Sequence, residues 1–315
     1  MGLIDIVQAI VNGLLIGGFY AICSVGLSLI FGVQRILNVA HGAFIVLASF
    51  VTIQFSLIIT PMYHLDPILS LVLDFFILGG LGAGIYFLLI YRIESSGFEA
   101  PLLATFGLSI FLEYFIQYGF GPIHPLDPSG GVGAQAQNQA YSSSSFFVDG
   151  IFFQEPQLIA LAVALVTIPL LHLFLTRTYF GKSIKATAQD WMAAEFSGID
   201  IRKTRLSSFV LGSGLAGVAG GIFAFTNSVT PSLGDTSLLP IILVVIILGG
   251  VGSILGTLVG GFVVGLLLNF SDLAAYNYLN IFGFQADVSY LITFFVFLVF
   301  LMLRPQGIFG KGTGS

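Results

Sequence analysis

Apolar stretches of membrane-spanning length alternate with short polar stretches along the whole 315-residue chain. An α-helix needs about 20 consecutive apolar residues to cross the hydrocarbon core of a bilayer. The pattern therefore predicts an all-α fold, a polytopic transmembrane helical bundle with about eight or nine spans in a single domain over residues 1–315. The apolar segments are Val7–Val33, Val39–Ile59, Pro67–Tyr91, Ala100–Phe120, Leu158–Thr176, Leu206–Ser228, Thr236–Leu248, Ser253–Phe270 and Asp287–Leu303.

The seventh and eighth segments are short and meet at the glycine-rich run Gly249–Ser253, so residues 236–270 form either two short spans or one long broken helix. Nine crossings with the N-terminus outside place every Lys and Arg in inner loops, as the positive-inside rule requires. We therefore favour two short spans and an inner C-terminus. The outer loops then hold only acids, namely Asp5, Asp66, Asp127, Asp149, Glu155, Asp235 and Asp272, with Asp287 at a segment edge.

Two polar stretches interrupt the membrane pattern. Residues 121–157 form an outer loop in which Asp149-Gly150 separates two apolar runs, a strong short-range signal for a β-hairpin. Residues 177–205 form an inner loop whose basic residues alternate with alanines and aromatics. This inner loop predicts one or two short helices that lie under the membrane and end at Gly198.

The composition agrees with a membrane protein. Hydrophobic residues make up 57% of the chain and charged residues only 8%, and the mean hydropathy is +1.02. A soluble domain carries about 25% charged residues, so this chain could not cover a water-facing surface of its size. Cys23 is the only cysteine, which excludes a disulfide framework within the chain.

Glycine-rich motifs then occur in a characteristic order. They are Gly26–Gly32 followed by Asn38–Gly42, Gly181–Asp190 continued by Ala193, Ala194 and Gly198, then Gly214–Gly221, Leu248–Gly256 and Leu303–Gly310. Together these motifs resemble the permease subunit of branched-chain amino-acid ABC importers, the LivH type, over nearly the whole chain. Each motif alone is weak, because glycine is common in membrane helices.

The resemblance implies a multi-pass protein of the prokaryotic cell membrane that works within a larger complex. Its implied partners are a second homologous permease, two cytoplasmic ABC ATPase subunits and an extracellular or periplasmic solute-binding protein. The implied solutes are branched-chain or other neutral amino acids. The sequence leaves open a permease of the same type for urea or short amides, and a stand-alone secondary transporter.

Sequence motifs for other chemistry were not found. The chain lacks the G-x-x-x-x-G-K-[ST] motif of ATP binding, so ATP hydrolysis is expected on the partner subunits and the chain itself is not expected to be an enzyme. The four histidines show no metal-ligand spacing. We expect no cofactor, no metal and no nucleic-acid partner beside the lipid bilayer and the protein partners.

The resemblance places a coupling helix at Ala186–Gly198 in the inner loop. Alanines allow two backbones to approach closely, which suits docking into a groove of an ATPase. The alternative is an ordinary amphipathic surface helix. The residues predicted to couple to the ATPase are Ala186, Asp190, Trp191, Ala193, Ala194 and Gly198.

Five residues are candidates for lining the translocation pathway. Asp74 and Glu113 lie inside apolar segments, where acids are costly and usually face protein or water. Asn38, His41 and Gly42 follow the first span at its inner end, where polar side chains can satisfy an interrupted backbone and a gate could form. For each residue the alternative is structural, either a packing contact or a helix cap.

The predicted topology can be checked by cysteine labelling in intact cells. We expect Asp149→Cys to react with a membrane-impermeant maleimide added outside and Lys185→Cys to stay unlabelled, because positive loops are retained in the cytoplasm. External labelling of Lys185→Cys would contradict the N-out, C-in arrangement.

Overall fold

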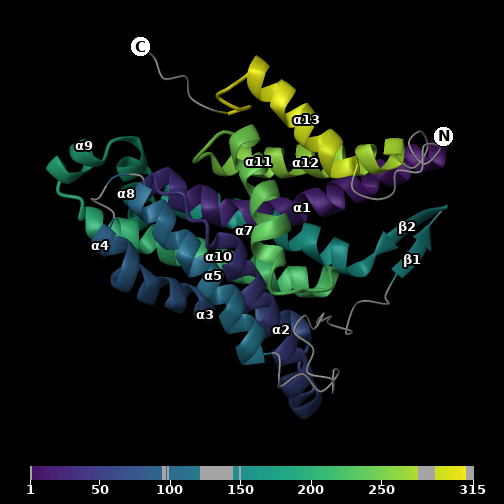
Figure 1. The fold of residues 1–315 in the computed structure, drawn as a ribbon, viewed down its shortest axis with the longest axis horizontal. Helices are drawn as coiled ribbons and strands as arrows, with labels where there is room; N and C mark the ends of the chain where they lie inside the picture. Colours follow the sequence, from purple (N-terminus) through teal and green to yellow (C-terminus); the bar gives the residue numbers. More distant parts are fainter. Residues whose placement is uncertain are drawn as a thin grey trace.

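Helices make up most of the chain, and one small β-hairpin joins them (Figure 1). The computed structural model describes residues 2–93, 97, 99–120, 145–148, 150–275 and 288–309. The helices of the first half are α1 (Leu3–Gln34), α2 (His41–Tyr63), α3 (Ser70–Ile85), α4 (Tyr91–Ile93) and α5 (Glu99–Phe120). Those of the second half are α7 (Glu155–Arg177), α8 (Tyr179–Gln189), α9 (Trp191–Phe196), α10 (Ile201–Thr226), α11 (Leu239–Gly249), α12 (Ile254–Ala274) and α13 (Val288–Leu303).

Short irregular helices extend two of these elements. A 3₁₀ turn, η1 (Pro67–Leu69), leads into α3, and a π-helix, η2 (Tyr86–Ile90), joins α3 to α4. A second π-helix, η4 (Gly234–Leu238), leads into α11. π-helical turns are rare and are frequently found at functional sites.

The predicted polytopic helical fold is confirmed. Seven helical stretches of the described chain are long and apolar enough to cross a membrane, and two shorter apolar helices, Gly234–Gly249 and Val288–Leu303, match the seventh and ninth predicted segments. The predicted break between the seventh and eighth segments is also present. Gly250 and Gly252 adopt φ values of 98° and 77°, which glycine tolerates and other residues rarely adopt.

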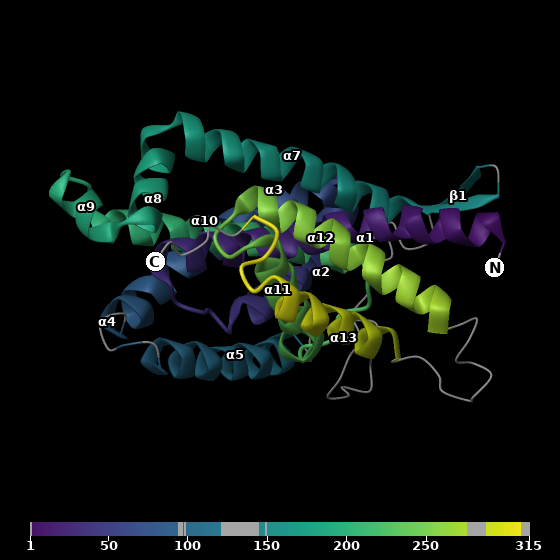
Figure 2. The same ribbon diagram turned by 90° about the horizontal axis from the view of Figure 1, so that it is seen from above.

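The two ends of the bundle differ in charge. Both views place α4, α8 and α9 at one end, which we call the basic end, and the N-terminus and the hairpin at the opposite end, which we call the hairpin end (Figures 1 and 2). Arg92 lies on α4, Lys182 and Lys185 on α8, and Arg202 and Lys203 on the first turn of α10. This clustering agrees with a cytoplasmic basic end.

The predicted β-hairpin is confirmed. Strands β1 (Ser145–Val148) and β2 (Ile151–Gln154) pair antiparallel with Val148 opposite Ile151, and Gly150 in the turn has φ +87°. Asp149 lies outside the described residues. The side chain of Gln8 anchors the hairpin to α1, because it accepts the Phe152 N–H at 2.8 Å and donates to the Phe152 carbonyl at 2.9 Å.

Helix α1 packs against α12 through backbone surfaces that glycines leave bare. A Cβ atom built on Gly261 would lie 2.7 Å from the Cβ of Ala21, and one built on Gly17 would lie 2.7 Å from the Cα of Phe262. Gly13 and Gly265 extend this contact by one turn. We call these four glycines, Gly13, Gly17, Gly261 and Gly265, the glycine seam.

Helix α10 uses glycine in the same way on three sides. Gly212 meets Gly26 of α1, Gly217 meets the backbone of α3 at Asp74, and Gly220 meets Ile45 and Ala48 of α2. Close approach of this kind replaces the hydrophobic effect, which does not operate between helices in lipid. Three neighbouring helices therefore surround α10 at backbone distance.

The glycine seam can be tested by adding one methyl group. We expect Gly261→Ala to destabilise the bundle by about 1–3 kcal/mol, since overpacking forces backbones apart. The control is Gly80→Ala on α3, where a Cβ meets nothing within 4 Å. The thermal unfolding midpoint of detergent-solubilised protein should fall for the first variant only. Equal midpoints would contradict the packing described.

Candidate functional site

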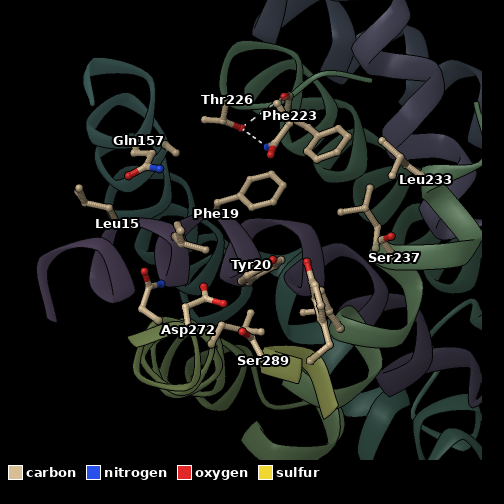
Figure 3. Close-up of a pocket in the computed structure, with 18 of the residues that line it drawn as sticks. Leu15, Phe19, Tyr20, Gln157, Phe223, Thr226, Leu233, Ser237, Asp272 and Ser289 are labelled. Carbon is tan, nitrogen blue, oxygen red and sulfur yellow. Dashed lines mark hydrogen bonds between the residues drawn. The ribbon is translucent and has the colours of Figure 1, made fainter. Parts of the chain in front are cut away.

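A cavity of about 370 Å³ lies at the hairpin end, where α7 and α13 begin and α10 and α12 end (Figure 3). α1 and η4 complete its wall. Its volume falls within the range of about 300–1,000 Å³ that small-molecule sites occupy. The cavity is therefore a candidate site for a small solute that approaches from the hairpin end.

One side of this cavity is apolar. The rings of Phe19 and Phe223 stack with their centroids 5.6 Å apart and an interplanar angle of 13°. Leu15 of α1 and Leu233 beside η4 add aliphatic surface (Figure 3). Two stacked rings and two leucines offer a surface suited to an apolar side chain.

Polar side chains line another part of the wall. Gln157 on the first turn of α7, Asp272 near the end of α12 and Ser289 on the first turn of α13 line it. Near the same rim, the side-chain amide of Asn227 donates to the Thr226 hydroxyl at 2.7 Å (Figure 3). The site thus combines an apolar wall with a few polar groups, as ligand sites commonly do.

A second cavity, of about 460 Å³, lies at the basic end. Ser28 of α1, His172 of α7, Lys185 of α8 and Gly252 of the glycine turn are among the residues that line it. α1, α7 and α12 therefore contribute to both cavities. Between the cavities these helices carry tightly buried residues, Ala21–Val25 and Leu27 on α1, Ala164 and Ile168 on α7, and Thr257 and Val264 on α12.

The predicted pathway residues near the first span lie deeper than expected. The ring Nε2 of His41 donates to the Cys23 carbonyl oxygen at 3.0 Å. Cys23 lies about three turns before the end of α1, so the chain after α1 folds back into the bundle. Gly42 packs against the backbone of Gly234, and Asn38 is fully buried. These residues therefore lie inside the bundle and not at its inner end.

Asp74 is packed between three helices. It is fully buried, and its carboxylate accepts a hydrogen bond from the Thr52 hydroxyl of α2. Gly217 and Gly221 of α10 close over it. This arrangement favours the packing interpretation of Asp74. Glu113 is half-buried on α5. None of the five predicted pathway candidates is among the described residues that line the two cavities.

The sequence analysis misplaced Asp235. Its carboxylate accepts a hydrogen bond of 2.6 Å from the hydroxyl of Ser109, which lies in the middle of α5. Asp235 is therefore at the level of the bundle interior, in π-helix η4, and not in an outer loop. The neighbouring Gly234 packs on the backbone of Gly42. In the sequence, this glycine is the local sign that close packing, and not a loop, begins at η4.

The predicted coupling segment forms two short helices, α8 and α9. Asp190 joins them and caps α9 by accepting the Ala193 N–H at 3.0 Å, and Gly198 follows α9 with φ +82°. Trp191 is 44% exposed and Phe196 is 92% exposed. Met192, Ala193 and Gly198 are exposed as well. Ala186 is half-buried.

Ala194 was expected to contact a partner directly, but it is buried against its own chain. The aromatic residues of α9, in contrast, project from the basic end. The large apolar side chains exposed on α9 are those of Trp191, Met192 and Phe196, beside the smaller Ala193 and the acid Glu195.

The start of α10 links this segment to α4. Asp200 caps α10, and hydrogen bonds from Lys203, first of all from its backbone N–H at 3.0 Å, hold the pKa of Asp200 below its ordinary value. The guanidinium of Arg202 lies 4.0 Å from the ring centroid of Tyr91, a cation–π contact. This contact connects α10, which follows α9 in the chain, to α4.

Comparison with known proteins assigns the chain. A family model described as the permease component of branched-chain amino acid transport systems matches residues 9–301. The chain belongs to this family. It is accordingly a transport permease and a multi-pass protein of the prokaryotic inner membrane, in agreement with its long apolar helices.

Two relatives match the permease over most of its length. The branched-chain amino acid transport permease BraD of Pseudomonas aeruginosa is 25% identical over 96% of this chain and 95% of its own length. The probable permease LivH of Methanocaldococcus jannaschii is 27% identical over 91% of this chain and 87% of its own length. The xylose transport permease XylH of Haemophilus influenzae is 34% identical, but only over 34% of this chain. No solved structure matches the permease.

Asp74 can be tested with two substitutions in the permease. Asp74→Asn keeps the size of the side chain and can still accept the Thr52 hydrogen bond, so we expect normal yield and normal uptake. Asp74→Leu removes the carboxylate acceptor of the Thr52 hydroxyl and leaves it only the Ser70 hydroxyl as a partner. Loss of a buried hydrogen bond costs about 0.5–1.5 kcal/mol and should lower the yield of folded protein. Normal folding of Asp74→Asn with abolished uptake would instead place the carboxylate in the transport pathway.

Proposed function

We propose that this permease is the membrane subunit of an ATP-driven importer for branched-chain or other neutral amino acids. The family match over residues 9–301 is the observation that carries the proposal. The cavity at the hairpin end supports it, because an apolar wall beside polar groups suits an amino acid with an apolar side chain. Two of its relatives are named as branched-chain amino acid permeases.

The energy for transport comes from partner subunits in this proposal. The chain has no ATP-binding motif, so two ABC ATPases hydrolyse ATP at the basic end and a second homologous permease completes the membrane part. The proposed ATPase contact is the set of large apolar side chains exposed on α9, those of Trp191, Met192 and Phe196. Large exposed apolar side chains on one short helix suit a partner surface, where buried aromatics contribute most of the binding energy.

The remaining residues of the coupling segment shape this surface. Asp190 and Gly198 set the ends of α9, and Ala194 holds α9 against the permease. α8 and α9 lie between α7 and α10, both of which line the cavity at the hairpin end. A push on α9 therefore reaches the cavity through two helices, and it reaches α4 through the Arg202–Tyr91 contact.

The β-hairpin is the proposed contact for an external solute-binding protein. Phe146, Phe147 and Val148 of β1 are exposed, and Gln8 fixes the hairpin to α1 beside the cavity. The outer edge of a two-stranded sheet presents unpaired backbone groups that a partner can use. The hairpin is thus placed to position a delivered solute near the cavity.

The alternatives have less support. A permease for urea or short amides would have little use for the stacked rings of Phe19 and Phe223, since these solutes have little or no apolar side chain. A stand-alone secondary transporter does not agree with the family match.

The proposal is tested by reconstituting the permease with its ATPases, second permease and binding protein in proteoliposomes. We expect ATP-dependent uptake of leucine that exceeds the uptake of glutamate and urea. Uptake that needs an ion gradient and no ATP, or a preference for glutamate, would overturn the proposal.

The coupling surface is tested in the same system with Phe196→Glu. A charge at this exposed ring should weaken ATPase binding or coupling about tenfold or more, the size expected of an interface hot spot. Phe180→Ala is the control, since Phe180 is an exposed aromatic residue of α8. Ala194→Arg is a weaker test of the contact, because Ala194 packs on its own chain. Wild-type uptake by Phe196→Glu would exclude α9 as the coupling surface.

A further inference from the structure

The cavity at the hairpin end carries an unbalanced charge. Asp272 supplies a carboxylate from the last turns of α12, and among the described residues that line the cavity no other is charged at neutral pH. Figure 3 shows Asp272 beside Ser289, on the polar side of the cavity. A carboxylate accepts hydrogen bonds and donates none, so a cationic donor is its natural ligand.

A second acceptor among the residues that line this cavity lacks a donor. The side-chain oxygen of Gln157 is buried and has no hydrogen-bond partner within the described part of the chain. A buried acceptor without a partner is costly, and the cost is removed when a ligand donates to it. An ammonium group has three N–H donors and can therefore serve more than one acceptor.

The opposite wall determines what the rest of the ligand must be. Phe19 and Phe223 present a stacked apolar surface, whereas basic side chains are absent from the described residues around the cavity. A suitable ligand therefore has an ammonium group and an apolar body. If the ligand also has a carboxylate, that group finds no charged partner among the described residues here.

We infer that this cavity selects its solute by the ammonium group, which Asp272 and Gln157 bind while Phe19 and Phe223 contact the apolar side chain. The inference rests on the proposed transport function and narrows it. It separates amino acids from urea and short amides, which have no ammonium group. It also implies that a carboxylate is dispensable for binding at this site.

The site can be read with a cysteine reporter in the purified complex, without the binding protein. Ser228→Cys places an exposed thiol at the cavity wall, and the native Cys23 is fully buried and should not react. The rate of maleimide alkylation is measured in the presence of leucine, leucinamide, 4-methylpentanoate or urea. Leucinamide has the ammonium group of leucine but no carboxylate. 4-Methylpentanoate has the carboxylate but no ammonium group.

We expect leucine and leucinamide to slow alkylation and the other two compounds to leave it unchanged. Adding Asp272→Asn should weaken the protection by leucine about tenfold or more, the effect of removing a hydrogen bond to a charged group. Asp272→Glu should retain part of it, because the charge remains. Glu155→Gln is the matched control, since Glu155 is an acid at the same end that does not line the cavity.

Three results would overturn the inference: equal protection by leucine with and without Asp272→Asn, protection by 4-methylpentanoate or urea as strong as that by leucine, or no protection by any compound. The unliganded alkylation rate and the elution volume of the complex show whether Asp272→Asn is folded. ATP-dependent leucine uptake by the wild-type complex is a separate measurement, so a failure here leaves the proposed function standing.

Discussion

Direct contact between helix backbones is the constraint on which the arrangement of this permease depends. Apolar side chains gain little by leaving lipid for another helix, so association relies on dispersion at close range. The glycine seam supplies that contact between α1 and α12, and Gly26 and Gly212 supply it between α1 and α10. The cavity at the hairpin end lies beside the glycine seam, because Leu15 of its wall lies between Gly13 and Gly17. The second cavity is lined by Gly32 and Gly252, which pack against each other. Both cavities therefore border these backbone contacts.

The succession of elements could be read from hydropathy and glycine alone. Each of the nine apolar segments corresponds to a helical stretch, and Gly250 and Gly252 mark the break between α11 and α12. Depth in the bundle could not be read, because hydropathy reports position along the chain and not in space. Asp235 stands just before an apolar segment, yet its partner Ser109 lies in the middle of α5. The folding back of the chain that brings His41 to Cys23 left no local pattern either.

The coupling segment could be predicted from local sequence, whereas the cavity could not. α8 and α9 are local, so the motif and Gly198 predicted them, although only the tertiary structure showed that Ala194 faces inward and Phe196 outward. The cavity is assembled from separate helices, and Gln157, Phe223 and Asp272 each look ordinary in their own surroundings. Polar residues within apolar segments were the available signal, and Asp74 shows that a hydrogen-bonded packing residue produces the same signal as a functional one.

The partners of Asp74 bear on how the chain enters the membrane during synthesis. α10, which closes over this acid, is made more than 100 residues after it. Thr52 and Ser70, in contrast, belong to the consecutive helices α2 and α3, and their hydroxyl oxygens lie 3.2 Å apart. The nascent α2–α3 pair can therefore leave the translocon with its carboxylate already hydrogen-bonded. Because α2 precedes α3 in the chain, the hydroxyl that donates to Asp74 is already made when α3 is synthesised.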